Sequence, residues 1–188
     1  GIEMMSRVPM LSDQASVFMD PAYATRCQML MMGSGADLIA SLNNVSREQA
    51  DAIAVQSQQR AAAAREKGYF KSIVPVHNPV KDITVTEDEC IRADVTLESL
   101  GEMTPAFAGI GAKGVDAYQL SGHSQLAQIE HVHTAGNSPA MADAATLVLL
   151  GDEALGRELG IEPRAKVVAS ATASDDPLQV LSGCVAAT

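Results

Sequence analysis

The chain has 188 residues, of which 47% are hydrophobic and 19% are charged, a composition typical of a soluble globular protein rather than a disordered one. Its formal net charge is −10, and it lacks the clustered Lys and Arg that a duplex-binding surface needs, which argues against nucleic acid as a partner. Three distant cysteines form no disulfide framework and no apolar run is long enough to span a bilayer, so we expect a cytoplasmic protein that does not bind a membrane.

The first forty residues predict little regular structure. Residues 1–24 carry Met and Pro at irregular spacing and predict a loop, and residues 36–42 predict a short helix that ends at Asn43. The sequence opens with Gly1 rather than Met and stops just after an apolar stretch. From these ends we expect an internal piece of a longer protein.

The clearest predicted helix covers residues 47–67. Ser46 and Gln49 stand at the spacing of a capping box, and Gly68 follows as a helix-ending glycine. Small side chains recur along the helix at 3.6-residue spacing and predict one narrow face. This face consists of Ala50, Ile53, Ala54, Ser57, Ala61 and Ala64.

The middle of the chain predicts short, mixed elements. Residues 73–76 and 83–85 predict strands separated by an Asn-Pro turn. A short helix is predicted over residues 96–100. Residues 108–124 are rich in Gly and Ala with few large apolar side chains, so we expect an irregular excursion there.

The last third of the chain has a different texture. Residues 129–135 alternate and predict a strand, while residues 145–150 and 166–172 are continuous apolar runs typical of strands buried on both faces. A helix over residues 152–159 separates these two runs. Alternating buried strands and helices predict a layered α/β fold, with the polar stretch before residue 129 as an insertion.

Short motifs that follow one another in a fixed order run through the chain. They include Gly1-Ile-Glu-Met-Met-Ser6, Ser46-Arg-Glu-Gln-Ala-Asp51, Gly68-Tyr-Phe70, Asp88-Glu-Cys-Ile-Arg92, Thr96-Leu-Glu-Ser-Leu100 and Thr134-Ala-Gly-Asn137. In this order, over essentially the whole chain, they resemble the thiolase family of 3-ketoacyl-CoA thiolases and acetyl-CoA acetyltransferases.

The resemblance implies an α/β fold in which two αβαβα halves are layered and an α+β loop domain is inserted in the first half. It places residues 1–10 at the end of the N-terminal half and residues 11–141 in the inserted, coenzyme A-binding loop domain. Residues 142–163 then supply the last strand and helix of that half, and residues 164–188 begin the C-terminal half.

The resemblance also implies which residues contact coenzyme A. Arg92 matches the arginine that contacts the nucleotide, a role that suits a planar, always-charged guanidinium. The other matching positions are Ser99 near the adenosine, Met31, Met32 and Gly33 along the pantetheine arm, and Ala135 beside the pantetheine amides. The alternatives are a surface ion pair for the arginine, a solvated helix hydroxyl for the serine and gap-filling core for the methionines.

One loop departs from the family pattern. Pro139 stands where the family has a serine that hydrogen-bonds pantetheine, and Ala140 and Ala144 replace glycines, which removes backbone freedom. Ser138 is the substitute hydroxyl, provided that the loop shifts. We therefore expect coenzyme A to bind more weakly or in a different pose.

Two histidines stand two residues apart in the predicted strand. His131 and His133 would point the same way, and two imidazoles are half of a zinc site, but the sequence offers no obvious third ligand nearby. We expect no metal. The two side chains are expected to line the acyl or pantetheine channel, or to pair with Glu130.

Catalysis in this family needs a nucleophilic cysteine, an activating histidine and a second cysteine, and the resemblance places all three outside residues 1–188. We assign no catalytic role to Cys27, Cys90 or Cys184. The expected function is that of a thiolase-type acyltransferase of fatty acid and lipid metabolism, with coenzyme A as a substrate, no cofactor, and a homodimer or homotetramer as the intact protein. The alternatives are a non-catalytic thiolase-like protein that binds acyl-CoA or lipid, and a metal-binding module on the two histidines.

Overall fold

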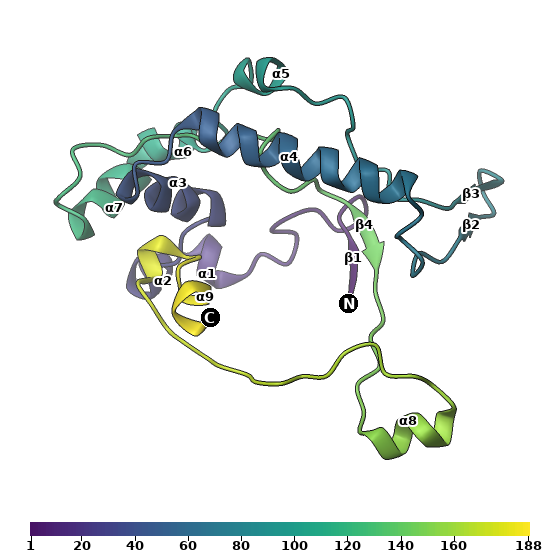
Figure 1. The fold of residues 1–188 in the computed structure, drawn as a ribbon. Helices are drawn as coiled ribbons and strands as arrows, with labels where there is room; N and C mark the ends of the chain where they lie inside the picture. The colour runs from purple at the N-terminus through teal and green to yellow at the C-terminus, as the bar shows by residue number, and fades with distance from the viewer. The chain divides into compact units, whose positions relative to one another are not determined.

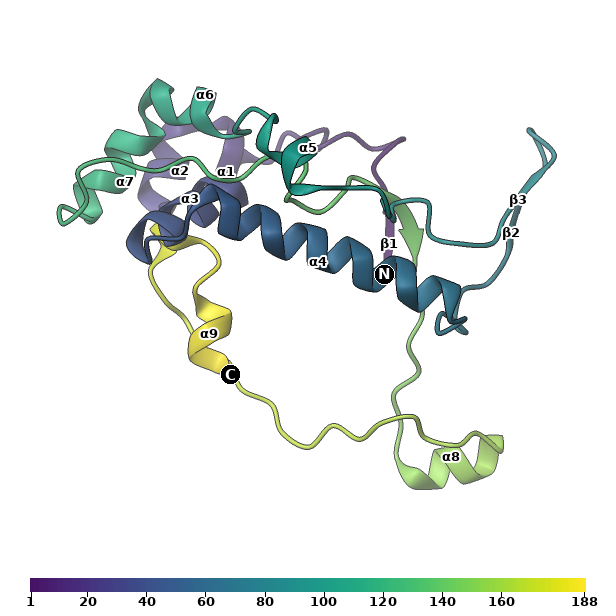
Figure 2. The same cartoon turned by 45° about the horizontal axis from the view of Figure 1, so that its top comes forward.

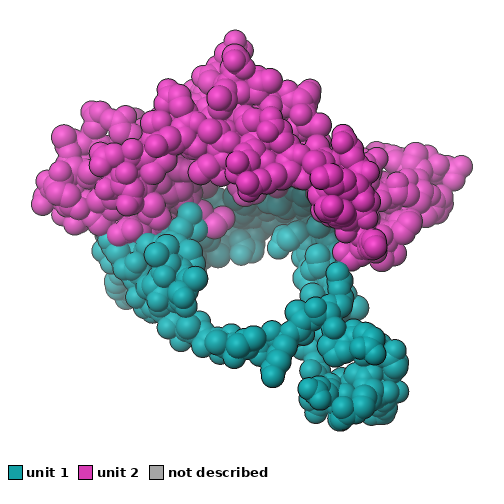
Figure 3. All heavy atoms as spheres, viewed as in Figure 1, with its two compact units in different colours: residues 1–29, 141–177, 181–188 teal, residues 30–140, 178–180 magenta. Residues whose placement is uncertain are grey.

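The computed structural model describes residues 1–20 and 22–188, and of residue 21 only the backbone, which opens a helix. The chain divides into two compact units (Figure 3). Unit 1 comprises residues 1–29, 141–177 and 181–188, and unit 2 comprises residues 30–140 and 178–180.

Unit 1 is built from short elements. In chain order these are β1 (Ile2–Met4), α1 (Ser16–Met19), α2 (Pro21–Cys27), β4 (Asp143–Ala145), α8 (Glu153–Leu159) and α9 (Gly183–Ala187). β1 and β4 pair antiparallel, with Ile2 opposite Ala145. Beyond the ladder, the carboxylate of Asp143 accepts the N–H of Ser6 at 2.9 Å and its hydroxyl at 2.5 Å. These bonds lower the pKa of Asp143. Residues 1–24, which were predicted as a loop, contain β1, α1 and the start of α2.

The two buried strands predicted in unit 1 were wrong over most of their length. β4 ends at Ala145, and the rest of the run is open to solvent, with Leu147 99% exposed. Residues 166–172 form no strand, and Val168 is 89% exposed. A strand buried on both faces needs neighbours in its sheet and layers above and below. Among the described residues only β1 pairs with β4, so the apolar pattern lacks the partners it requires.

The helix predicted over residues 152–159 was confirmed as α8. The side chain of Asp152 accepts the N–H of Leu155 at 2.9 Å and caps the first turn. Gly160 ends the helix at a φ of +63°, a left-handed conformation that glycine adopts without a Cβ clash.

Unit 2 is organised around its longest helix, α4 (Arg47–Glu66), which confirms the predicted helix almost residue for residue (Figure 1). Ser46 and Gln49 form the predicted capping box, and Gly68 follows the helix at a φ of +66°. α3 (Met32–Leu42) begins four residues earlier than predicted. Leu38 from α3 anchors the small core with Ile129 and Leu178.

The other elements of unit 2 lie around the two ends of α4. β2 (Val76–Asn78) and β3 (Ile83–Val85) form an antiparallel hairpin beyond its C-terminal end, and α3, α6 (Ala108–Ile110) and α7 (Asp116–Gly122) lie near its N-terminal end (Figures 1 and 2). The predicted strands at 73–76 and 83–85 are thus present, the first one shifted toward the turn. α5 (Leu97–Gly101) confirms the predicted short helix.

The irregular excursion predicted for residues 108–124 was wrong, because this stretch is helical through α6, a π-helical turn at Gly111–Val115 and α7. Packing overrides the low helix propensity of its glycines. Gln119 of α7 is fully buried, and its side-chain amide donates to the carbonyl of Ser34 at 2.9 Å and to that of Leu178 at 3.2 Å.

The strand predicted over residues 129–135 was also wrong. The segment is extended but belongs to no sheet. Side chains of α3 take its backbone donors instead: Ser41 accepts the N–H of Glu130 at 2.8 Å, and Asp37 accepts those of Val132 and His133 at 3.1 Å each. A helix thus does for this segment what a neighbouring strand does in a sheet.

No helix that the structure describes combines the length and the apolar character needed to cross a membrane.

Candidate functional site

An open groove of about 420 Å³ runs along α4 in unit 2. Three segments line it: one face of α4, the segment before Thr96, and the loop that follows Thr134. The lining residues are Ala50, Ile53, Ala54, Ser57, Gln58, Ala61, Asp88, Cys90, Ile91, Arg92, Gly136, Asn137, Ser138, Pro139 and Ala140. A hollow of about 500 Å³ at the end of α8, in unit 1, contains none of the residues predicted to bind a ligand.

The small-residue face of α4 forms one wall of this groove rather than part of a core. Five of its six predicted members line the groove, and the largest of them, Ile53, is 69% exposed. Small side chains leave room for a ligand against the helix while offering it an apolar surface. The spacing was visible in the sequence, but the sequence did not show that this face lines a groove.

Arg92 spans the groove from the segment before α5. Its backbone N–H donates to the side-chain oxygen of Gln58 on α4 at 2.7 Å, and its Nη2 donates to the carbonyl of Gly136 at 3.0 Å. Its Nε is buried and has no partner among the described residues. Arg92 therefore joins the two walls, with its backbone N–H on α4 and its guanidinium on the loop, and its Nε has no acceptor among the described residues.

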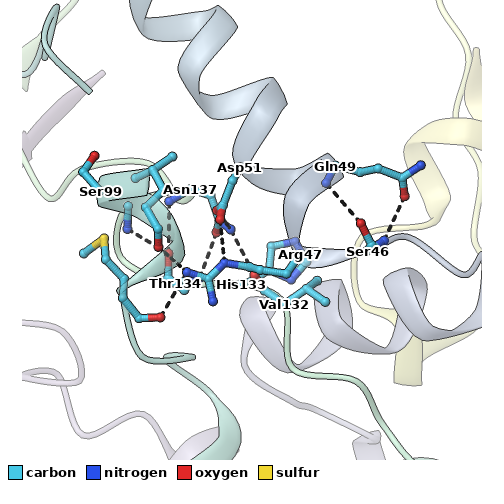
Figure 4. A network of polar contacts seen from close by, with 12 residues as sticks. Ser46, Arg47, Gln49, Asp51, Ser99, Val132, His133, Thr134 and Asn137 are labelled. Carbon is cyan, nitrogen blue, oxygen red and sulfur yellow. Dashed lines mark hydrogen bonds and ion pairs between the residues drawn. The ribbon is translucent and has the colours of Figure 1, made fainter. Parts of the chain in front are cut away.

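The loop at residues 136–140 forms the second wall of the groove, the loop wall. A buried polar network holds this loop wall in place (Figure 4). Asp51 of α4, 2% exposed, accepts from Arg47 Nε at 2.8 Å and from Asn137 Nδ2 at 2.8 Å. Asn137 also donates to the carbonyl of Val132 at 2.9 Å and accepts the N–H of Thr134 at 2.8 Å. Arg47 extends the network to α5, because its Nη2 donates to the carbonyl of Leu100 and, at 3.0 Å, to that of Met103.

Gly136 must be a glycine for this loop to pack on α5. A Cβ there would lie 2.4 Å from the sulfur of Met103 and 2.5 Å from Cδ2 of Leu100. We expect Gly136→Ala to lower the free energy of unfolding by about 1–3 kcal/mol, the usual cost of overpacking, in a urea titration. Gly101→Ala is the matched control, since a Cβ there meets nothing within 4 Å. Equal stabilities for the two variants would contradict this packing.

The groove brings together only some of the residues predicted to contact coenzyme A. Arg92 and Ser138 line it, together with Pro139, while Ala135 is exposed beside it. Ser99 instead completes the capping box of α5, where its hydroxyl oxygen accepts the N–H of Thr96 at 3.1 Å.

The predicted pantetheine residues lie at the start of α3, outside the groove lining. Met31 is the N-cap residue, and Met32 is 69% exposed, so it does not fill a core. Gly33 lies directly against the ring of Phe107, where a Cβ would come within 1.9 Å of the ring carbons.

The two histidines share one partner, and it is not the predicted Glu130. Both reach Asp37, with His133 Nδ1 at 2.6 Å and His131 Nδ1 at 2.8 Å from its oxygens, while the side chain of Glu130 contacts Gln128. Burial alone would raise the pKa of Asp37, but the bonds from His133 and His131 outweigh it and lower that pKa. Within the part of the chain that the structure describes, no three His, Cys, Asp or Glu side chains are placed to hold a metal ion.

Two groups of groove residues were mainly missed as ligand contacts in the sequence. They are the apolar wall on α4 and two polar residues, Gln58 and Asp88. Cys90 also lines the groove and is partly buried, whereas Cys27 and Cys184 are exposed. The Thr134-Ala-Gly-Asn137 motif was the usable signal for the loop wall, since its Asn and Thr side chains form the turn itself.

Known proteins are similar to this chain in sequence and in fold. The family described as "Thiolase, N-terminal domain" matches residues 1–154. The 3-ketoacyl-CoA thiolases of Escherichia fergusonii and Chromohalobacter salexigens are 33% and 34% identical over 94% and 100% of this chain, which correspond to 42% and 44% of their own length. The chain therefore spans about two fifths of these relatives.

A solved structure is also similar to this chain. The crystal structure of human mitochondrial 3-ketoacyl-CoA thiolase in complex with CoA has a TM-score of 0.60 to this chain at 26% identity, covering 84% of this chain and 36% of that one. The predicted α/β thiolase-type fold class is thereby confirmed. The family match covers most of the chain, and the chain belongs to the thiolase family.

Proposed function

We propose that this chain supplies the coenzyme A-binding part of a thiolase-type acyltransferase, which moves an acyl group between an acyl-CoA and coenzyme A through a cysteine acyl-enzyme. The observation that carries the proposal is the groove along α4, crossed by the partly buried guanidinium of Arg92. Membership of the thiolase family supplies the class of ligand.

The groove offers what the nucleotide end of coenzyme A needs. Its volume lies within the ~300–1,000 Å³ of ordinary small-molecule sites, and its lining combines apolar walls with a few polar groups. Arg92 supplies the cation for a phosphate or a plane for the adenine. An acceptor on the ligand that reached its Nε would also satisfy a buried donor that otherwise has no partner among the described residues.

The loop after Asn137 would meet the pantetheine arm. Pro139 lines the groove without a hydroxyl, and the partly buried Ser138 beside it lines the groove too. We therefore place the pantetheine hydrogen bond on Ser138, in a pose shifted by one residue from the family pattern. Met31, Met32 and Gly33 remain proposed contacts for the distal end of the arm.

The affinity for coenzyme A tests this site. We expect Arg92→Met to raise the Kd of coenzyme A at least tenfold, since a charge-assisted hydrogen bond contributes about 1.5–3 kcal/mol. Isothermal titration calorimetry on the purified chain measures the effect. Arg157→Met makes the same charge change on α8 of unit 1, where the side chain is 74% exposed and lies outside the groove lining. If both variants bind alike, the groove is not the nucleotide site.

The acyl-transfer chemistry is proposed to come from residues outside 1–188. Cys27 and Cys184 are exposed, and Cys90 lines a groove that has no histidine in its lining. The groove lining therefore offers Cys90 no histidine as the base that a nucleophilic thiol needs. We expect no thiolysis of 3-ketoacyl-CoA by the 188-residue chain, and turnover by it would contradict the proposal. The intact enzyme is proposed to be a cytoplasmic homodimer or homotetramer that uses coenzyme A as substrate and no cofactor.

Pro139 favours one second candidate, a non-catalytic thiolase-like protein that carries acyl-CoA or lipid. Losing a pantetheine hydrogen bond harms catalysis, which needs precise placement of the thioester, more than it harms binding. The intact protein separates the two candidates: a carrier would bind acyl-CoA without thiolysis, whereas an enzyme would cleave 3-ketoacyl-CoA.

A further inference from the structure

Asp37 is a fully buried carboxylate that does not line the groove. It stands in the middle of α3, and its Oδ1 accepts the backbone N–H groups of Val132 and His133 at 3.1 Å each. His133 Nδ1 lies 2.6 Å from the same oxygen, and His131 Nδ1 lies 2.8 Å from Oδ2. Burying a carboxylate is unfavourable unless its oxygens are satisfied, and here a single side chain gathers four contacts to one short segment.

His131 links this carboxylate to a second one. Its Nδ1 faces Asp37 on α3, and its Nε2 lies 3.1 Å from Asp116 on α7. A neutral imidazole carries only one N–H, so both contacts are hydrogen bonds only when His131 is an imidazolium. The carboxylates of Asp37 and Asp116 are the charged groups that α3 and α7 place against the His131 ring. On the same segment as His131, His133 also contacts Asp37.

The electrostatics agree with that geometry. Burial by itself would lower the pKa of His131, but the hydrogen bonds to Asp37 and Asp116 outweigh it and raise the pKa above its ordinary value of 6.5.

The segment that Asp37 holds, which contains Val132 and His133, continues directly into the loop wall of the groove. The carbonyl of Val132 accepts from Asn137 Nδ2 at 2.9 Å. The hydroxyl oxygen of Thr134 accepts the N–H groups of Gly136 and Asn137 at 3.1 and 3.3 Å. Gly136 and Asn137 line the groove, and the carbonyl of Gly136 receives Arg92. Hydrogen bonds thus run without a break from Asp37 to the arginine.

We infer that Asp37 is a positioning residue for the coenzyme A groove, holding the segment before the loop wall while His131, as an imidazolium, ties it to Asp116. The inference rests on the proposed coenzyme A function of the groove. Asp37 touches no ligand in this scheme. It acts through Val132 and His133, whose backbone it fixes, and through them on the loop that carries Gly136.

A definite pH dependence follows. Because the pKa of His131 is raised in the folded chain, its contribution is fully present below 6.5 and is lost as the pH rises through the higher, folded value. The pKa of Asp37 is lowered from 3.8, so its contribution is present above 3.8 and is lost only as the pH falls through the lower, folded value. The groove is therefore best held between about pH 4 and 6.5, and it loosens as the pH rises through the raised pKa of His131.

NMR and calorimetry on the same ¹⁵N-labelled chain test the inference. We expect the ring nitrogens of His131 to titrate with a midpoint above 6.5, and the Kd of coenzyme A to rise at least fivefold across that midpoint. His131→Gln removes the titrating group and reports the pH dependence that comes from coenzyme A itself. Asp116→Asn, which alters a partly exposed residue, should move both the midpoint and the loss of affinity to the same lower pH.

The control and the contrary outcomes are distinct. His77→Asn, in the exposed β2–β3 hairpin, should change neither quantity. A His131 midpoint at or below 6.5, or a loss of affinity that does not move with Asp116→Asn, overturns the positioning role. A wild-type chain that binds no coenzyme A at any of these pH values overturns the proposed function instead, because the ring-nitrogen titration does not depend on the ligand.

Discussion

Asp37→Ala is expected to lower the free energy of unfolding by about 3–5 kcal/mol at pH 6.5, the usual cost of removing one partner of a buried ion pair. The change leaves the imidazolium of His131 without its buried counter-charge. It also leaves the backbone N–H of Val132, a residue only 5% exposed, without an acceptor. Urea or guanidinium titration, followed by a signal from unit 2, measures the loss.

Asp37→Asn separates the two parts of this cost. An asparagine keeps an oxygen for the N–H groups of Val132 and His133 but removes the charge that faces His131. We expect it to lose about half as much stability as the alanine variant, and to lose it mainly below the pKa of His131, where the imidazolium needs a carboxylate. Wild-type stability in Asp37→Ala would mean that the buried carboxylate does not hold the segment.

The helices of unit 2 could be predicted because their signals are local. The capping box of Ser46 and Gln49 fixes the start of α4, and the left-handed Gly68 fixes its end. Both signals lie within a few residues of the backbone groups they satisfy. The family motifs likewise singled out Arg92, which the structure places in the lining of the groove.

The strands of unit 1 could not be predicted from the apolar pattern, because a strand is defined by its neighbours. Leu147 and Val168 have the composition of a buried sheet, yet they are exposed because no described strand pairs with their segments. The strand predicted around His131 was wrong for the opposite reason. The backbone N–H groups of this segment do have acceptors, but the acceptors are side chains of α3, 89 and 95 residues earlier in the chain.

The groove shows which part of the proposed coenzyme A site a single sequence hides. Ala54 and Ser57 were predicted as one face of a helix, but a face of small residues packs a core or lines a ligand site equally well. Only the placement of Arg92 and Gly136 opposite that face distinguishes the two uses. The polar side chains that support the wall are hidden from a single sequence for the same reason. Asp51 and Asn137 are hydrogen-bonded to each other although 86 residues separate them in the chain.

Asp51→Ala is expected to lower the free energy of unfolding by about 3–5 kcal/mol and to weaken coenzyme A binding as well. Asp51 is 2% exposed and is the shared acceptor of Arg47 and Asn137. Without it, the charge of Arg47 is left partly buried with only the carbonyls of Leu100 and Met103 as acceptors.

The matched control for Asp51→Ala is Gln56→Ala, which removes an exposed polar side chain from the same helix and should change stability by less than about 0.5 kcal/mol. Arg47→Met in the Asp51→Ala background then decides the cause. If the loss comes from an unpaired buried charge, removing that charge should recover part of the stability, because two apolar partners are tolerated where one lone ion is not. If the double variant is as unstable as the sum of the two single variants, the loss comes from packing instead, and Asp51 is not the counter-charge that joins α4 to the loop wall.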